Sequence, residues 1–114
     1  MFLHEQHCEA KTTPTLLTEE QINTFLKEIP QWHISENKKE ILCTFKFKDY
    51  HQTLLFINAV AEIVHFENHH PDIKFGYNHC AIHFSTHSAG GITIFDLICA
   101  AQIEQLLSKK DFEI

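Results

Sequence analysis

Two short runs of alternating apolar and polar residues, separated by a long helical segment, constrain the fold most strongly. In residues 41–48 (ILCTFKFK), Ile, Cys, Phe and Phe occupy every second position, which is the period of a strand that is buried on one face. Residues 79–84 (HCAIHF) repeat this alternation. The segment between them, residues 50–68, has helical periodicity and is stopped by Pro71. Strands that alternate with helices predict an α+β domain.

Capping residues indicate where the helices begin. The segment TEEQINTFLKEIP, residues 18–30, starts with a capping box and ends at a proline. Asp49 caps the long helix, and Thr93 with Asp96 caps a last helix that runs to about Ser108. With two further strands before residues 41 and 79, the order is α-β-β-α-β-β-α. We therefore predict a four-stranded antiparallel sheet covered on one face by three helices. The long helix is expected to bury Leu54, Leu55, Ala59, Ile63 and Phe66.

The length of 114 residues fits one compact domain. Residues 1–17 lack sustained periodicity and contain KTTPT, so we interpret them as a loose leader that packs only locally. Residues 18–114 are expected to form the single domain. The four cysteines are widely spaced and contain no C-x-x-C motif, which favours reduced structural thiols over a disulfide framework.

The charge distribution excludes several classes of partner. The formal net charge is −6, and the lysines form no basic cluster, so neither nucleic acid nor an anionic membrane surface is an expected ligand. No apolar run approaches the roughly 20 residues that a membrane span requires. The first ten residues also lack the pattern of a secretory signal. We therefore expect a cytoplasmic protein.

Histidines are concentrated in one part of the chain. Five of the ten fall between Glu67 and Gly91. His69 and His70 stand at a proline-terminated helix end, and His87 ends a strand just before a glycine-containing loop, where sites are commonly built. Imidazole titrates near neutral pH, so two or three histidines around one pocket could donate and accept protons. No nucleophile motif is present, and the pattern suits addition or elimination of water.

Two other interpretations of the histidines remain open. His65 and His69 are four residues apart, and His87 or Cys80 could complete a zinc site. The H-E-x-x-H arrangement is absent, which makes this signal weak. In so histidine-rich a chain, several of these residues are also expected to have no functional role, and we assign His79 and His83 to that group.

The spacing of His69, His70, Pro71, Tyr77, His87 and Asp96, with STHSAGGIT around His87, resembles the signature of the pterin-4a-carbinolamine dehydratases. The similarity also includes IPQWHI near the first strand, FKFKDYHQTLLFINAVAEI before and within the long helix, and HCEA in the leader, which is similar to bacterial members. It covers nearly the whole chain.

The resemblance implies a hydro-lyase that dehydrates 4a-hydroxytetrahydrobiopterin to quinonoid dihydropterin and thereby recycles the pterin of aromatic amino acid hydroxylases. It implies catalysis without a metal or organic cofactor, and assembly into homodimers or homotetramers. By position, the catalytic residues would be His69, His70 and His87. The expected substrate-binding residues are Asp96, Tyr77, Trp32 and Thr86.

The chain departs from the family pattern at two positions. His65 stands where many members have an acidic residue four before the histidine pair, and Ile73 stands where an aromatic residue is common. A rival role is also implied by the family, because animal members double as dimerisation partners of a homeodomain transcription factor. A protein-interaction module without relevant catalysis, or a zinc protein, therefore stands as the alternative.

Overall fold

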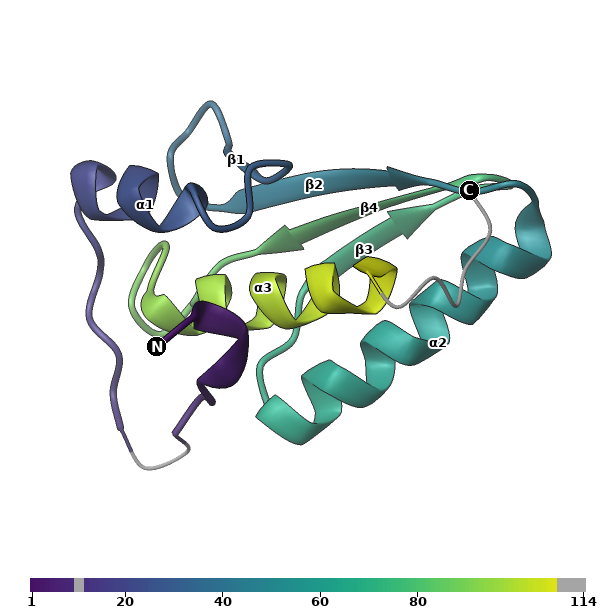
Figure 1. Cartoon of the computed structure of the whole chain (residues 1–114). Helices are drawn as coiled ribbons and strands as arrows, with labels where there is room; N and C mark the ends of the chain where they lie inside the picture. The colour runs from purple at the N-terminus through teal and green to yellow at the C-terminus, as the bar shows by residue number, and fades with distance from the viewer. Residues whose placement is uncertain (10–11, 109–114) are drawn as a thin grey trace.

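The computed structural model describes residues 1–9 and 12–108 and has the predicted α+β architecture. Four antiparallel strands form one sheet in the order β1-β2-β4-β3, with α2 and α3 packed on one face and α1 near the end at which β2 begins (Figure 1). The strands are β1 (His33–Ile34), β2 (Ile41–Lys46), β3 (Asp72–Phe75) and β4 (His79–Phe84). The helices are α1 (Glu19–Leu26), α2 (Tyr50–Glu67) and α3 (Ile94–Ser108), preceded by a 3₁₀ turn at Leu3–Glu5.

The alternation predicted for the two central strands is confirmed. In β2 and β4, side chains at every second position are buried, and Cys43 pairs with Ile82 while Phe45 pairs with Cys80. These side chains face the helices and form the core, together with Phe56 from α2. The intervening side chains, including His83, lie on the opposite face of the sheet. The sheet therefore has one covered face and one open face.

The predicted caps are also confirmed. The backbone N–H of Gln21 donates to Oγ1 of Thr18 at 3.1 Å, and the backbone N–H of Thr18 donates to Oε1 of Gln21 at 2.9 Å. This reciprocal pair satisfies two donors that the first turn of α1 would otherwise leave unpaired. At the start of α2, Oδ1 of Asp49 accepts the backbone N–H of Gln52 at 2.9 Å.

The buried face of α2 differs from the prediction. Phe66 is 75% exposed and Leu55 is 39% exposed, so the expectation that they are buried is wrong. Leu54, Ala59 and Ile63 are half-buried. Leu55 and Phe66 share a face with the exposed polar residues His51, Asn58 and Glu62, so their apolar character alone did not indicate burial. The residues that α2 buries are Thr53, Phe56, Val60, Val64 and Glu67.

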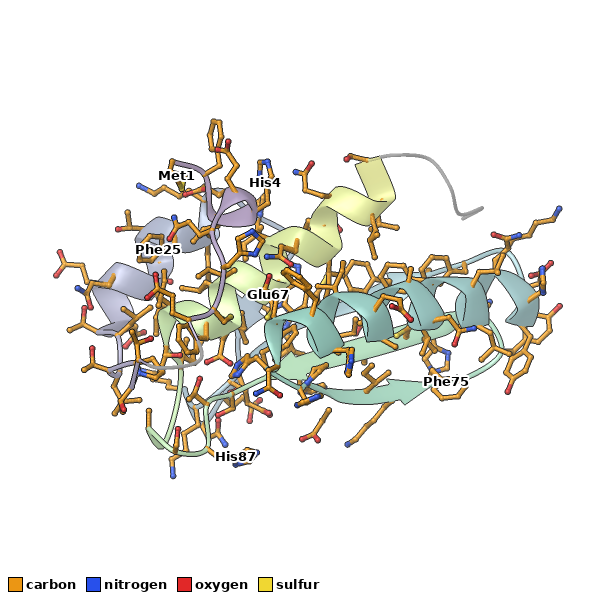
Figure 2. The ribbon with its side chains drawn as sticks, turned by 90° about the horizontal axis from the view of Figure 1, so that it is seen from below. Met1, His4, Phe25, Glu67, Phe75 and His87 are labelled. Atoms are coloured by element: carbon orange, nitrogen blue, oxygen red, sulfur yellow. The ribbon has the colours of Figure 1, made fainter. Side chains whose placement is uncertain are left out.

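The leader packs on the rest of the domain rather than only among its own residues, which differs from the loose leader expected from the sequence. Leu3 has no exposed surface, and its backbone N–H donates to Oε1 of Glu28 at 2.9 Å. The backbone N–H of Cys8 donates to Oε1 of Glu67 at 2.7 Å. Figure 2 shows Glu67 at the end of α2, between the leader and α3. The division of the chain at residue 17 stays a prediction.

The thiols are free, as the sequence predicts. Cys43 and Cys80 are buried in neighbouring strands. Burial raises the pKa of Cys43 to about 12 and that of Cys80 to about 11, so both stay protonated at neutral pH. Within the described residues, no helix combines the length and the apolar character needed to cross a membrane.

Candidate active site

The site begins where α2 ends. Asn68 adopts the left-handed conformation, with φ 53° and ψ 42°, and terminates the helix after Glu67. The backbone N–H of His69 then donates to the carbonyl of Val64 at 3.2 Å, which is the type of bond that closes a helix C-terminus. His69 therefore lies just beyond the helix, near the helix end predicted from Pro71. The left-handed residue redirects the chain before the histidine pair begins.

His69 is held by ring packing and by one short hydrogen bond. Its Nε2 lies 2.6 Å from Oδ1 of Asp96. Its ring lies parallel to that of Phe84, with 5.9 Å between the ring centroids, and edge-on to Phe95 at 6.0 Å. The side chain is 13% exposed, and that of Asp96 is fully buried. One end of the imidazole is thus fixed against a carboxylate inside the protein.

Asp96 uses its second oxygen to hold the start of α3. Oδ2 accepts the backbone N–H of Thr93 at 2.9 Å and the hydroxyl of Thr86 at 2.9 Å. The hydroxyls of Thr86 and Thr93 are 2.7 Å apart and form a second link. One carboxylate therefore makes the predicted contact at the start of α3 and a contact with His69. Thr86 is 5% exposed, so its hydroxyl is committed to Asp96 and Thr93.

This pairing determines which nitrogen of His69 can act on another molecule. A carboxylate of Asp96 accepts hydrogen bonds only, so the imidazole presents Nε2–H to it. In neutral His69 the lone pair is then on Nδ1, the nitrogen that does not face Asp96. A fixed carboxylate partner also stabilises the imidazolium that forms when Nδ1 takes a proton. This arrangement can serve as an oriented general base.

His70 and His87 line a different hollow, which we call the open pocket. It has a volume of about 360 Å³ and lies beside the end of β4 and the loop that follows. Both imidazoles are exposed, and Figure 2 shows His87 at the edge of the molecule. The residues around the open pocket are Asn37, Lys39, Glu40, His70, Asp72, His83, Ser85, His87 and Gly90.

His69 lines a smaller hollow of about 200 Å³, which we call the leader pocket because Cys8, Glu9, Thr12 and Pro14 form part of its wall. Consecutive residues alternate between the two hollows. His69 and His70 are divided in this way, and so are residues 85–88, of which Ser85 and His87 line the open pocket while Thr86 and Ser88 line the leader pocket. The backbone of residues 69–70 and 85–88 therefore separates the two hollows, and we call it the partition. From the sequence we expected the three histidines to surround one pocket. In the structure, His70 and His87 line the open pocket and His69 lines the leader pocket.

Glu67 fixes the leader beside the partition. It accepts hydrogen bonds from Nδ1 of His7 at 2.6 Å, the backbone N–H of Cys8 at 2.7 Å and Nε2 of Gln102 at 2.8 Å. Burial alone would raise the pKa of Glu67, but the hydrogen bonds from His7, Cys8 and Gln102 outweigh it and hold the pKa below its usual value. Glu67 therefore carries a negative charge at neutral pH and ties the leader, α2 and α3 together.

Trp32 and Tyr77 do not join these residues. Trp32 is 2% exposed, and its indole N–H donates to Oε1 of Glu104 at 3.0 Å within the core. Tyr77 is 64% exposed in the turn between β3 and β4, at the far end of β3 from His70. Figure 2 shows how far the neighbouring Phe75 lies from His87. Neither aromatic side chain lines either hollow, so the structure does not bring them to the histidines.

The residues considered as zinc ligands do not converge. His65 is exposed on α2, His69 pairs with Asp96, and Cys80 is buried in the core. Across residues 1–9 and 12–108, no group of three His, Cys, Asp or Glu side chains is placed to hold a metal ion.

Sequence reasoning missed several polar residues of the open pocket. His83, which we expected to have no role, lines it together with Glu40, and Nδ1 of His83 lies 3.3 Å from Oε1 of Glu40. The register of β4 with β2 and β3 would have placed His83 on the same face as Asp72. A single strand pattern shows which residues share a face, but not which side chains of other strands stand beside them.

Comparison with known proteins identifies the family. The family described as "Pterin 4 alpha carbinolamine dehydratase" matches residues 15–106. This chain belongs to that family. A Legionella pneumophila (strain Corby) protein provisionally named as such a dehydratase is 42% identical over 107 residues, covering 92% of this chain and 95% of the relative. A Nitrosomonas eutropha protein of the same provisional name is 44% identical, covering 88% of this chain and 86% of the relative.

Solved structures of the dehydratase family have the same fold. The chain matches the crystal structure of a transcriptional coactivator/pterin dehydratase from Brucella melitensis with a TM-score of 0.76 and 29% identity, covering 79% of this chain and 96% of the other. It also matches a pterin dehydratase-like protein identified as a RuBisCO assembly factor in the alpha-carboxysome, with a TM-score of 0.58 and 25% identity over 67% of this chain and 88% of the other.

Proposed function

We propose that this chain dehydrates a 4a-hydroxytetrahydropterin to a quinonoid dihydropterin and water. In this reaction the bond between C4a and the hydroxyl oxygen breaks, and the hydroxyl leaves as water with a proton from an acid. A base removes the proton from N5, and its electron pair forms the C4a–N5 double bond. One acid and one base are sufficient. The observation that carries the proposal is the oriented His69–Asp96 pair beside a pocket lined by His70 and His87.

The division of the histidines suits the two halves of the reaction. His70 and His87 are assigned to the hydroxyl side, where a solvent-accessible imidazole can supply a proton and water can leave. His69 is assigned to the nitrogen side, because Asp96 leaves its Nδ1 lone pair available and stabilises the resulting imidazolium. A volume of about 360 Å³ lies within the range of small-molecule sites, so we place the pterin ring in the open pocket, with its N5 edge turned toward the partition and His69.

The decisive experiment follows the decay of 4a-hydroxytetrahydropterin in a rapid-mixing assay. His69→Ala, His70→Ala and His87→Ala variants are each expected to lower turnover by about 10² to 10⁴, the usual contribution of an essential acid or base. His51→Ala is the matched control, because His51 is an exposed histidine near the start of α2, at the opposite end of that helix from His69, and it should retain wild-type turnover. Wild-type turnover in all three site variants would contradict the proposal.

Self-association is part of the proposal. Tyr50, Leu55 and Phe66 are large apolar side chains exposed on α2, at 46%, 39% and 75%, and exposed apolar side chains are available for contacts between subunits. We expect a homodimer or homotetramer, to be measured by light scattering coupled to gel filtration. Phe66→Glu should shift the mass toward the monomer. A cytoplasmic location and a functional link to an aromatic amino acid hydroxylase also stay predictions.

A further inference from the structure

A carboxylate and an imidazole form a pair in the open pocket that the proposed reaction does not use. Glu40 immediately precedes β2, and His83 lies on β4. Their 3.3 Å contact joins side chains that are 31% and 22% exposed, respectively. Both line the same hollow as His70 and His87. A charged side chain that is held in place beside a proposed substrate position is suited to orienting that substrate.

The backbone around Glu40 is fixed to the neighbouring strand. The hydroxyl of Ser85 donates to the carbonyl oxygen of Lys39 at 2.8 Å. Ile41 pairs with Phe84, and Leu42 pairs with His83. The position of the Glu40 carboxylate relative to the end of β4 is therefore set by backbone pairing as well as by the contact with His83. His87 follows three residues after Phe84. Glu40 and His87 are therefore both positioned by the end of β4.

The substrate class presents a complementary group. The pyrimidine ring of a pterin carries two adjacent hydrogen-bond donors, the 2-amino group and N3–H. A carboxylate can accept both at once, and charge-assisted pairs of this kind are the stronger hydrogen bonds. N3 is separated from C4a only by C4, so a carboxylate at this edge lies on the same ring as the reacting carbon. Binding there would fix the direction in which the C4a hydroxyl points.

We propose that Glu40, positioned by His83, binds the 2-amino and N3 donors of the pterin and thereby selects 2-amino-4-oxo pteridines as the substrate class. This inference rests on the proposed function. Asp72 is the other carboxylate of the pocket, and it is exposed at the start of β3. We favour Glu40 over Asp72 because Glu40 is less exposed and has an imidazole partner.

The first test compares Glu40→Gln with the matched control Glu36→Gln, because Glu36 is an exposed carboxylate of the preceding turn that does not line the open pocket. Glu40→Gln conserves shape but replaces one acceptor oxygen by a donor. It should raise KM by about 10- to 100-fold, the range expected for loss of a charge-assisted hydrogen bond. We expect kcat to change by less than about threefold, because the lost interaction contributes to binding and not to acid or base chemistry. Glu36→Gln should leave both parameters near the wild-type values, and Asp72→Asn, which changes the other carboxylate of the pocket, should raise KM less than Glu40→Gln does. An unchanged KM in Glu40→Gln, or an equal or larger rise in Asp72→Asn, overturns the proposal.

The second test uses ligand specificity and needs no variant to fold. Wild type should bind 7,8-dihydropterin more tightly than 7,8-dihydrolumazine, in which a carbonyl replaces the 2-amino group, by at least about tenfold. Glu40→Gln should lose most of that preference. Equal affinity of the wild type for the two compounds overturns the assignment even if dehydratase turnover is normal. Absence of turnover in the wild type would instead overturn the proposed function, and this inference with it.

The role of His83 is tested by rescue. As a positioning residue, it should affect KM and the pterin preference without affecting kcat. His83→Leu should raise KM, and His83→Gln, which retains an N–H donor for Glu40, should restore part of the loss. A similar KM in His83→Leu and wild type would show that Glu40 needs no partner and would overturn this part of the proposal.

Discussion

The two sides of the partition contain the same kind of side chain in opposite surroundings. On the leader side, His69 is 13% exposed, packed between aromatic rings and bonded to a buried carboxylate. On the open side, His70 and His87 are exposed around a larger hollow. The difference indicates that one imidazole is oriented before any substrate arrives, while the other two can exchange protons with solvent. Variants that act on one side only can test this distinction.

The largest effect is expected from Asp96→Asn. Oδ2 must remain an oxygen to accept from Thr86 and Thr93, so the amide nitrogen would face His69 and donate to its Nε2. The proton of neutral His69 would then move to Nδ1, where the proposed base needs a lone pair. We expect kcat to fall by roughly 10² to 10⁴. Nitrogen NMR of His69 should report the exchanged tautomer, and a variant with the exchanged tautomer and wild-type kcat would rule out His69 as the base.

Next in size is the loss of stability when Glu67 is changed to Gln. The side chain keeps one acceptor oxygen but loses the charge that His7, Cys8 and Gln102 stabilise, so the free energy of unfolding should fall by about 1–3 kcal/mol at pH 7. Glu62→Gln, at an exposed position of the same helix, is the control and should change little. Urea unfolding measures both variants. Equal losses would show that the anchoring of the leader does not depend on this carboxylate.

The difference in unfolding free energy between wild type and Glu67→Gln should depend on pH. Because the pKa of Glu67 is lowered in the folded state, its contribution is fully present above the pKa of the unfolded chain, near 4.3. It is lost as the pH falls through the lower pKa of the folded state. The stability advantage of wild type over Glu67→Gln should therefore shrink as the pH is lowered from about 5. An advantage that grows on acidification would contradict the direction of the shift.

The smallest effect is expected on the stability of His87→Ala, which we compare with the stability of His69→Ala. His69→Ala removes a ring packed on Phe84 and Phe95 and should cost about 1–3 kcal/mol of unfolding free energy. His87→Ala, at an exposed position, should stay within about 0.5 kcal/mol of wild type. Thermal unfolding at one pH measures both variants. Equal costs would remove the proposed difference between the two sides.

The sequence was informative where one short-range pattern determines structure. Alternation in β2 and β4 and the capping residues Thr18 and Asp49 predicted the sheet and the helix starts, because each depends on neighbours within a few residues. The burial of Leu55 and Phe66 on α2 was predicted wrongly, since both lie on the face that carries the exposed polar residues of the helix and their apolar character alone did not indicate the core face. The packing of Leu3 was also missed, because one apolar residue in an aperiodic leader carries no such signal.

Sequence patterns drew attention to His69, His70, His87 and Asp96, but they did not show how these residues are grouped in space. The helix stop before Pro71 identified the histidine pair, and the cap spacing identified Asp96. The division of the imidazoles between two hollows depends on how residues 69–70 and 85–88 pack together in the fold, which no sequence pattern showed. The contact of Glu40 with His83 joins positions 43 residues apart in the sequence, and only the strand register brings them together.

Because His69 and His70 are adjacent in the chain, a single peptide unit joins the two sides of the partition. Their Cα atoms are about 3.8 Å apart whatever surrounds them. The separation of the proposed base from one of the proposed acids is therefore limited by covalent bonds, whereas the walls of the two hollows come from distant segments. Substitutions in those walls could therefore change which substrate ring binds, while the distance between the backbones of His69 and His70 stays the same.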